Sequence, residues 1–348
     1  MGDVIHALPA LTDAKSALKD IQFDWVVEPG FSEIPRWHQA VNEVLSVPLR
    51  KWRKQPWQTF KSGEWKPFIE RLRKVKYDAV IDAQGLFKSA LITRMAKGKR
   101  IGPCLKSAKE SLASLFYQRT VKVDQLQHAV QRSRKLFAQA LHYPLPETPP
   151  DYGIDRSRLM PLSYGDKTIL FLHGTTWTTK HWPADYWRQL GVLVSNADYQ
   201  VLLPWGNDIE HERAQSIYDF VVKRGFKPPV VLPKLNLGEL TTLIAKAKGI
   251  VAVDTGLGHI AAAMATPTVS LYGPTDPDLT GAYGPWQEHL RAQFPCAPCF
   301  GRTCQKGENF AINPPCFETI PPEKVWDALN EMMINHKAAI PHAHPFAI

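Results

Sequence analysis

The stretch that decides the fold runs from Ile250 to Pro277 and reads IVAVDTGLGHIAAAMATPTVSLYGPTDP. Its first four residues, 250–253, form an apolar run with β-branched side chains, which is typical of a strand buried on both faces of a parallel sheet. A polar turn at Asp254-Thr255-Gly256 breaks the run, and small and apolar residues follow at helical density up to Met264. The stretch therefore predicts a strand, a tight turn, a helix and a second strand.

The turn between this strand and helix is a candidate anion site. Backbone N–H groups near Thr255 and Gly258 would lie at a helix N-terminus, where the helix dipole favours phosphate. His259 and the Gly273-Pro274-Thr275-Asp276 turn add polar groups at the same sheet edge. The plainer alternative is an ordinary crossover in which Asp254 only caps the helix. We expect this stretch to form half of a nucleotide-binding site.

The rest of the chain repeats the alternation of strands and helices. In the first half we expect strands at 23–27 and 77–82, and helices at 37–45, 66–75, 86–95 and 127–141. In the second half we expect strands at 168–173, 200–203 and 230–232, and helices at 184–194, 209–220, 237–247 and 322–333. Such alternation predicts an α/β protein with parallel sheets covered by helices on both faces.

The length and a proline cluster predict two domains. A chain of 348 residues is long for one hydrophobic core, and YPLPETPP at 143–150 is typical of a linker. We expect an N-terminal domain at 1–150, a linker at 151–166 and a C-terminal domain at 167–348, the last with a cysteine-rich tail and a terminal helix.

Charge is concentrated in the first half. Residues 1–158 carry 27 Lys and Arg against 16 Asp and Glu, and 50–76 alone carry ten basic and two acidic side chains. Such an excess suggests an anionic partner, whether a phosphorylated substrate, an acidic membrane surface or nucleic acid. No apolar run approaches a membrane span and no signal-peptide pattern opens the chain, so we expect a cytosolic protein.

Five motifs together resemble the lipopolysaccharide heptosyltransferase I family of glycosyltransferase family 9. They are MGDVIHALPAL at 1–11, DAQGL at 82–86, KHWP at 180–183, LPWG at 203–206 and DTG at 254–256. The resemblance implies a GT-B fold, in which two Rossmann-like, doubly wound domains face a central cleft. It also implies inverting transfer of heptose from ADP-heptose to the Kdo residue of Kdo-lipid A, in an enzyme peripheral to the cytosolic face of the inner membrane.

The resemblance also implies roles for individual residues. Asp3 would be the general base that takes the proton of the acceptor hydroxyl, and Lys180 would bind the diphosphate and offset the charge growing on ADP. The other donor-binding candidates are Thr175, Thr176, Glu210, Leu235, Asp254, Thr255, Gly256 and His259. Thr175 could equally be a simple turn residue, and Glu210 a first-turn helix carboxylate. His173 is expected to be structural.

The basic first half would then bind the acceptor, because Kdo carries a carboxylate and lipid A carries phosphates. The candidates are Arg50, Lys51, Arg53, Lys54, Lys88 and Arg119. Trp52 and Trp57, interleaved among them, could lie at the level of lipid headgroups. No recognised RNA or DNA module accompanies the cluster, so nucleic acid is not an expected partner.

Three features depart from the family pattern. The Met1-Gly2-Asp3 motif should follow a buried first strand, so we expect the natural protein to be longer and to carry that strand. Cys296, Cys299, Cys304 and Cys316 are spaced so that they could hold structural zinc. The string Asp276-Pro277-Asp278 resembles a metal-binding motif, but its prolines mark a turn, and we expect catalysis without a metal cofactor.

Two other functions remain open on the sequence. The cysteine tail gives some weight to another family 9 glycosyltransferase, such as one like heptosyltransferase II. A non-catalytic basic protein that binds anionic membrane or nucleic acid is the alternative from a different class.

Overall fold

The computed structural model describes residues 1–162, 164–306 and 310–339. The chain divides into two compact units, Met1–Arg158 and Leu159–Ile348, and their boundary falls within the stretch predicted to be a linker. None of the described helices is long and apolar enough to cross a membrane.

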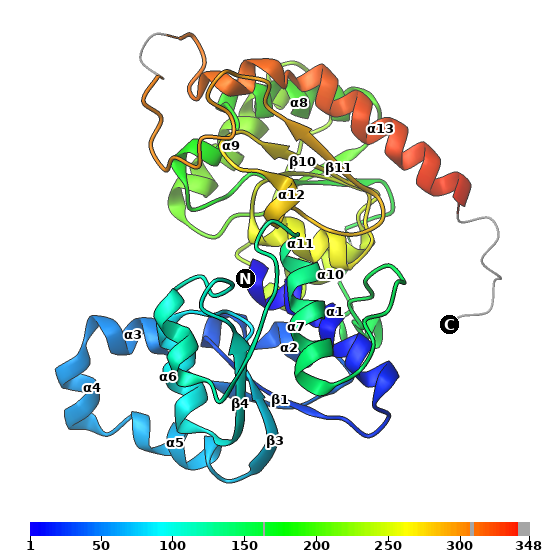
Figure 1. The fold of residues 1–348 in the computed structure, drawn as a ribbon. Coiled ribbons are helices and arrows are strands. Elements are labelled where there is room, and N and C mark those ends of the chain that lie inside the picture. The colour runs from blue at the N-terminus through cyan, green and yellow to red at the C-terminus, as the bar shows by residue number, and fades with distance from the viewer. Residues whose placement is uncertain (163, 307–309, 340–348) are drawn as a thin grey trace. The chain divides into compact units, whose positions relative to one another are not determined.

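The N-terminal unit contains two parallel sheets (Figure 1). The strands are β1 (Phe23–Val27) and β2 (Val41–Ser46) in one sheet, and β3 (Lys76–Ile81), β4 (Lys97–Pro103) and β5 (Arg119–Val121) in the other. Within the described residues β1 pairs only with β2, and β3 only with β4. The expected extra strand before Met1 stays a prediction.

Seven helices of this unit surround the two sheets. They are α1 (Gly2–Ala17), α2 (Glu33–Arg36), α3 (Leu49–Lys54), α4 (Pro56–Ser62), α5 (Trp65–Leu72), α6 (Phe87–Met95) and α7 (Ala129–Leu141). The MGD motif therefore opens a long helix, with Asp3 in its first turn. Residues of α1 and α7 share one hydrophobic cluster with Ile101 of β4 and Val121 of β5.

One predicted element of this unit is wrong. The helix expected at 37–45 is in fact β2, which pairs in parallel with β1 and places Val44 opposite Trp25. The apolar positions Val41, Val44 and Leu45 fit a helical period, but in the strand Leu45 packs beside Val47 and Phe68 in one hydrophobic cluster. A short apolar run does not distinguish a helix from a strand, and here the pairing with β1 selects the strand.

The C-terminal unit is one six-stranded sheet in the order β11-β10-β9-β6-β7-β8, and every pair is parallel. The strands are β6 (Thr168–Leu172), β7 (Gln200–Leu203), β8 (Val230–Val231), β9 (Gly249–Val253), β10 (Thr268–Tyr272) and β11 (Gln287–Arg291). As predicted, β9 is buried along its whole length, and so are β6 and β10.

Helices connect these strands and complete the core. They are α8 (Ala184–Asn196), α9 (Asp208–Val222), α10 (Leu237–Lys246), α11 (Gly256–Ala263), α12 (Pro277–Thr280) and α13 (Pro322–Ala339). Trp182 and Trp187 are fully buried and pack edge to face, and the Trp182 indole N–H donates to the carbonyl of Ile320 at 3.0 Å. This bond joins the entry of α8 to the chain before α13.

A buried ion pair holds α1 against α7. The Arg134 guanidinium donates to both carboxylate oxygens of Asp13, at 2.6 and 3.1 Å, and both side chains are less than a tenth exposed. Arg134 also donates to the carbonyls of Pro146 and Thr148. The pair therefore fixes the start of the chain to the segment that leaves the N-terminal unit.

Because removing one partner leaves the other charge buried and unpaired, we expect Asp13→Ala to lower the free energy of unfolding by about 3 to 5 kcal/mol. Denaturant unfolding followed by circular dichroism measures the change. Glu43→Gln is the control, since the Glu43–Arg71 pair is exposed on both sides and is expected to contribute less than about 1 kcal/mol. Equal effects of the two variants would contradict the role given to the buried pair.

Candidate functional site

The sheet of the C-terminal unit has a topological switch point between β6 and β9. From β6 the chain continues through β7 and β8 on one side, and β9 to β11 lie on the other. Loops that leave the carboxyl ends of two such strands turn to opposite faces and open a crevice where ligands bind. The turn at Asp254 follows β9, and the loop from His173 to Lys180 follows β6, so the predicted donor residues gather at this point.

An ion pair joins the two loops. Lys180 Nζ lies 2.6 Å from Asp254 Oδ2, and the side chains are only 15% and 9% exposed. Thr275, in the turn after β10, donates its hydroxyl to the same carboxylate oxygen at 2.7 Å. Thr175 donates its hydroxyl to the backbone carbonyl of Asp254 at 3.0 Å. Three loops from neighbouring strands therefore converge on Asp254.

The local sequence places Lys180 at this edge. Lys180 ends a short 3-10 turn, Thr178–Lys180, and the chain then enters α8 through Trp182 and Pro183. Trp182 is buried in the core, so it anchors the chain two residues after the lysine. Across the pair, Thr255 is the N-cap of α11, and the first turn of that helix faces the same edge through Gly256. The site thus combines an ammonium group with a helix N-terminus.

Glu210 lies at the same sheet edge, in the first turn of α9. Its carboxylate accepts the backbone N–H of Gly206 at 2.7 Å. A Cβ atom at residue 174 would lie 2.5 Å from Glu210 Oε1, so only glycine allows this approach. Both predicted alternatives for Glu210 are thus compatible with its position: it supports the start of the helix and it borders the loop after β6.

The remaining donor candidates have different degrees of exposure. Thr176 is exposed in the loop after β6, and Leu235 is half-buried in the loop before α10. His259 is buried in the first turn of α11. These residues all belong to loops or helix starts at the carboxyl edge of the sheet.

His173 is structural, as expected. Burial, with smaller effects of the Arg213 and His181 charges, lowers the pKa of His173 to about 3, so its ring is neutral at physiological pH. Arg213 donates to the His173 carbonyl at 2.9 Å, and the His173 ring packs edge to face on Trp187.

Asp3, the predicted general base, lies in the N-terminal unit, in the first turn of α1. Its carboxylate is half-exposed and lies 3.1 Å from Lys109 Nζ. Burial lowers the pKa of the Met1 amine; Asp3 raises it, and Arg50 and Lys88 lower it further. Burial also lowers the pKa of Arg132, and Asp3 opposes this shift. Three cations from different helices therefore act electrostatically on Met1 or with Asp3, and a fourth, Lys109, contacts Asp3 directly.

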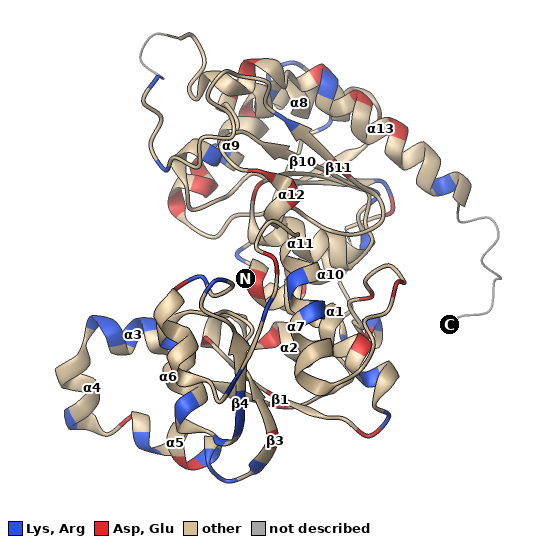
Figure 2. Ribbon diagram, in the orientation of Figure 1, with Lys and Arg blue, Asp and Glu red and all other residues tan. Residues whose placement is uncertain are grey.

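The other acceptor candidates are Arg119 and three residues of α3, the helix that also carries Arg50. Arg119 donates to the carbonyls of Gln139 and Ala140 at the end of α7, which is at the amino end of β5 and so at the opposite edge from the DAQGL turn. Lys51 is paired with Glu64, and Arg53 and Lys54 are exposed on α3. Figure 2 shows Lys and Arg residues, in blue, along α3.

The DAQGL motif has a structural function. Asp82 is buried and accepts the backbone N–H groups of Gln84 and Gly85, at 2.8 and 3.1 Å, and the hydroxyl of Tyr117 at 2.7 Å. Gly85 adopts a φ of 64°, which a side chain would strain. The motif shapes the turn that leads to Lys88.

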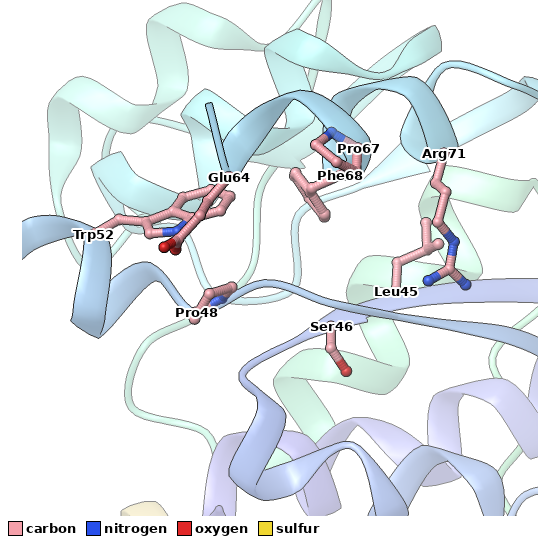
Figure 3. Close-up of a pocket in the computed structure, with 8 residues that line it drawn as sticks. All are labelled: Leu45, Ser46, Pro48, Trp52, Glu64, Pro67, Phe68 and Arg71. Atoms are coloured by element: carbon pink, nitrogen blue, oxygen red, sulfur yellow. The ribbon is translucent and has the colours of Figure 1, made fainter. Parts of the chain in front are cut away.

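A cavity of about 230 Å³ lies beneath the basic helices α3 and α5 (Figure 3). Its lining is mainly apolar and consists of Leu45, Ser46, Pro48, Trp52, Glu64, Pro67, Phe68 and Arg71. None of the predicted site residues lines it, although Lys51 holds Glu64 at its wall. Trp52 of α3 packs edge to face on Phe68 of α5 beside this cavity.

The acidic string after β10 is engaged in the fold. Asp276 caps α12 by accepting the backbone N–H of Asp278 at 2.9 Å, and Arg291 donates to Asp278 at 2.7 Å. No group of three or more His, Cys, Asp or Glu side chains within residues 1–162, 164–306 and 310–339 is arranged to hold a metal ion. The four cysteines are unpaired thiols, and the zinc hypothesis gains no support from their arrangement.

Sequence reasoning missed several residues around both sites. Lys109 and Arg132 lie in a loop and a helix far along the chain from Asp3, and no local pattern marks them. Trp177, Thr178 and Thr179 directly precede Lys180, and this adjacency was a usable signal. The ring of Trp177 lies 4.4 Å from Lys180 Nζ.

A parallel α/β sheet with a cation and a helix N-terminus at its switch point is the architecture of a nucleotide-binding enzyme domain. The model of Glycosyltransferase family 9 (heptosyltransferase) matches residues 65–309, and the chain belongs to this family. It is therefore a glycosyltransferase, as the sequence motifs predicted.

Relatives cover nearly the whole chain. Lipopolysaccharide heptosyltransferase 1 of Pseudomonas aeruginosa is 50% identical over 344 residues, which is 96% of each chain. The protein of the same name from Escherichia coli K12 is 48% identical and covers 84% of this chain and 91% of its own length. The solved structure of E. coli heptosyltransferase WaaC with ADP-2-deoxy-2-fluoro heptose matches with a TM-score of 0.81 at 41% identity, over 95% of this chain and 96% of that one.

If Lys180 binds a diphosphate, Lys180→Met should weaken ADP binding about 10- to 100-fold, the loss of one or two charge-assisted hydrogen bonds. Titration calorimetry with ADP measures the dissociation constant. Lys167→Met is the control, because Lys167 belongs to the same unit and its pair with Asp198 is exposed. An unchanged dissociation constant in Lys180→Met would remove this lysine from the site.

Proposed function

We propose that the chain transfers heptose from ADP-heptose to the Kdo residue of Kdo-lipid A, with inversion, in the assembly of the lipopolysaccharide inner core. The observation that carries this proposal is the 50% identity to a lipopolysaccharide heptosyltransferase 1 over 96% of both chains. Lipopolysaccharide heptosyltransferase 2 of Salmonella typhimurium is 27% identical over 76% of each chain, which favours the first transferase over the second.

On the donor side, Lys180 and the N-terminus of α11 would hold the diphosphate. The ammonium has three donors, so it can keep Asp254 and still contact a phosphate oxygen. It would also offset the negative charge that grows on ADP as the anomeric bond breaks, and so do the work for which other transferases use a metal ion. Thr175, Thr176, Thr255, Gly256 and His259 would line the phosphates and sugar, with Glu210 and Leu235 toward the nucleoside.

On the acceptor side, Asp3 would be the general base. Attack of an acceptor hydroxyl on the anomeric carbon forms the new C–O bond while the bond to the diphosphate breaks, and the hydroxyl proton passes to a carboxylate. Lys109 orients the Asp3 carboxylate from one side. Arg50, Lys88 and Arg132 supply positive charge around it, which suits an acceptor sugar that carries a carboxylate.

We also place the enzyme at the cytosolic face of the inner membrane, where its lipid-linked acceptor would be embedded. The helices α3 and α4 support this. Trp57 and Phe60, three residues apart on α4, are 80% and 70% exposed, and Arg53, Lys54 and Lys61 flank them. Aromatic rings beside cations suit the headgroup region of an anionic bilayer.

The role of Asp3 predicts a separation of binding from chemistry. Asp3→Asn keeps the shape but not the basicity, so we expect the transfer rate to fall about 10²- to 10⁴-fold while the dissociation constant of ADP stays within twofold. Release of ADP from ADP-heptose in the presence of Kdo-lipid A measures the rate. Asp20→Asn is the control: Asp20 is exposed just after the same helix, and this variant should be fully active. Full activity of Asp3→Asn would exclude Asp3 as the base.

A further inference from the structure

The cysteine-bearing segment after β11 contacts the loop that carries Lys180. Thr179 donates its hydroxyl to the carbonyl of Gly301 at 2.6 Å, and Thr178 donates to the carbonyl of Arg302 at 2.9 Å. Thr179 is only 4% exposed, so its bond is shielded from water. Two consecutive side chains of the lysine loop are therefore tied to two consecutive backbone groups of the segment.

An aromatic ring adds a third contact. Arg302 Cζ lies 4.9 Å from the centre of the Trp177 ring, and Lys180 Nζ lies 4.4 Å from the same centre. Each cation is attracted to the electron-rich ring face. Trp177 thus lies between the segment and the ammonium group of the donor site.

The same segment is bound to the turn after β10. The backbone N–H of Phe300 donates to the carbonyl of Pro274 at 2.7 Å. The neighbouring residue, Thr275, donates to Asp254, which in turn pairs with Lys180. These contacts form a closed ring. Lys180 pairs with Asp254, Asp254 accepts from the turn after β10, that turn binds residues 300–302, and residues 300–302 bind the loop that carries Lys180. Residues 300–302 therefore add two side-chain hydrogen bonds to the other contacts that hold the Lys180 loop, which include those of Thr175 and Trp182.

Cysteine thiols lie beside this segment and beneath the turn to which it binds. Cys299 Sγ would lie 3.5 Å from a Cβ at position 301. Burial, with the nearby Cys296, Cys304 and Cys299, raises the pKa of Cys316 to about 11. Cys316 Sγ would lie 3.2 Å from a Cβ at position 273, so it packs directly beneath the turn after β10. Cys316 therefore lies where the turn that binds the segment packs on the core.

We propose that residues 300–302 position Lys180 for the diphosphate, and that Thr178 and Thr179 are the positioning residues that transmit this support. The proposal rests on the donor role of Lys180 proposed above. It assigns to the cysteine segment a function in substrate binding that its spacing alone did not indicate. The segment touches no substrate in this account and acts only through the lysine loop.

Thr179→Val tests the proposal, because valine keeps the shape and loses the hydroxyl. We expect the dissociation constant of ADP and the KM of the sugar-nucleotide donor to rise about five- to tenfold, with the KM of the acceptor unchanged. Thr179→Ser keeps the hydroxyl and should restore ADP binding to within twofold of the natural protein.

Thr241→Val is the matched control. Thr241 is fully buried in α10 of the same unit, and its hydroxyl donates to a backbone carbonyl at 2.7 Å, as that of Thr179 does. Thr241→Val should lower the melting temperature about as much as Thr179→Val does, without changing ADP binding. Equal ADP affinity of Thr179→Val and the natural protein would overturn the proposal. Failure of the natural protein to bind ADP would instead overturn the proposed function.

Discussion

The ion pair between Lys180 and Asp254 is the constraint around which the C-terminal unit is organised. It joins the loops after β6 and β9, the two adjacent strands at which the chain reverses its direction across the sheet. A buried pair of this kind is costly to break from one side, because the remaining charge has no compensation. The loops of neighbouring strands are therefore held at one separation, and Thr175 and Thr275 add hydroxyl groups around the same carboxylate. The site is preorganised before any anion arrives.

The N-terminal unit also brings charged groups together, but they come from several separate elements. No single basic run surrounds Asp3; the nearby cations come from the start of α3, the first turn of α6, the loop before the 3-10 turn at 111–116, and α7. The buried pair of Asp13 with Arg134 keeps α1 and α7 together, and so keeps Arg132 near the start of α1. The contact between Asp13 and Arg134 thus both stabilises the packing of α1 on α7 and keeps a cation near Asp3.

The sequence predicted most of the C-terminal unit, because strands such as β6 and β9 are mainly apolar, buried over their whole length and followed by polar turns. It did not predict β11, whose side chains are mostly polar. It failed at residues 37–45, where a six-residue strand has the apolar spacing of a helix and only pairing with β1 decides. The motifs singled out Lys180, Asp254 and Asp3. Arg119 stays a predicted acceptor residue, and its side chain donates to carbonyls at the end of α7. Lys109, Arg132 and the contacts of 300–302 depend on packing between distant segments, which no local pattern reports.

The most direct test of this account is a crystal structure of the protein with ADP. The account predicts that a diphosphate oxygen lies within hydrogen-bond distance of Lys180 Nζ, that the phosphates face the N-terminus of α11, and that Lys180 keeps its contact with Asp254. A diphosphate bound at another part of the sheet edge, with Lys180 contacting Asp254 alone, would contradict it.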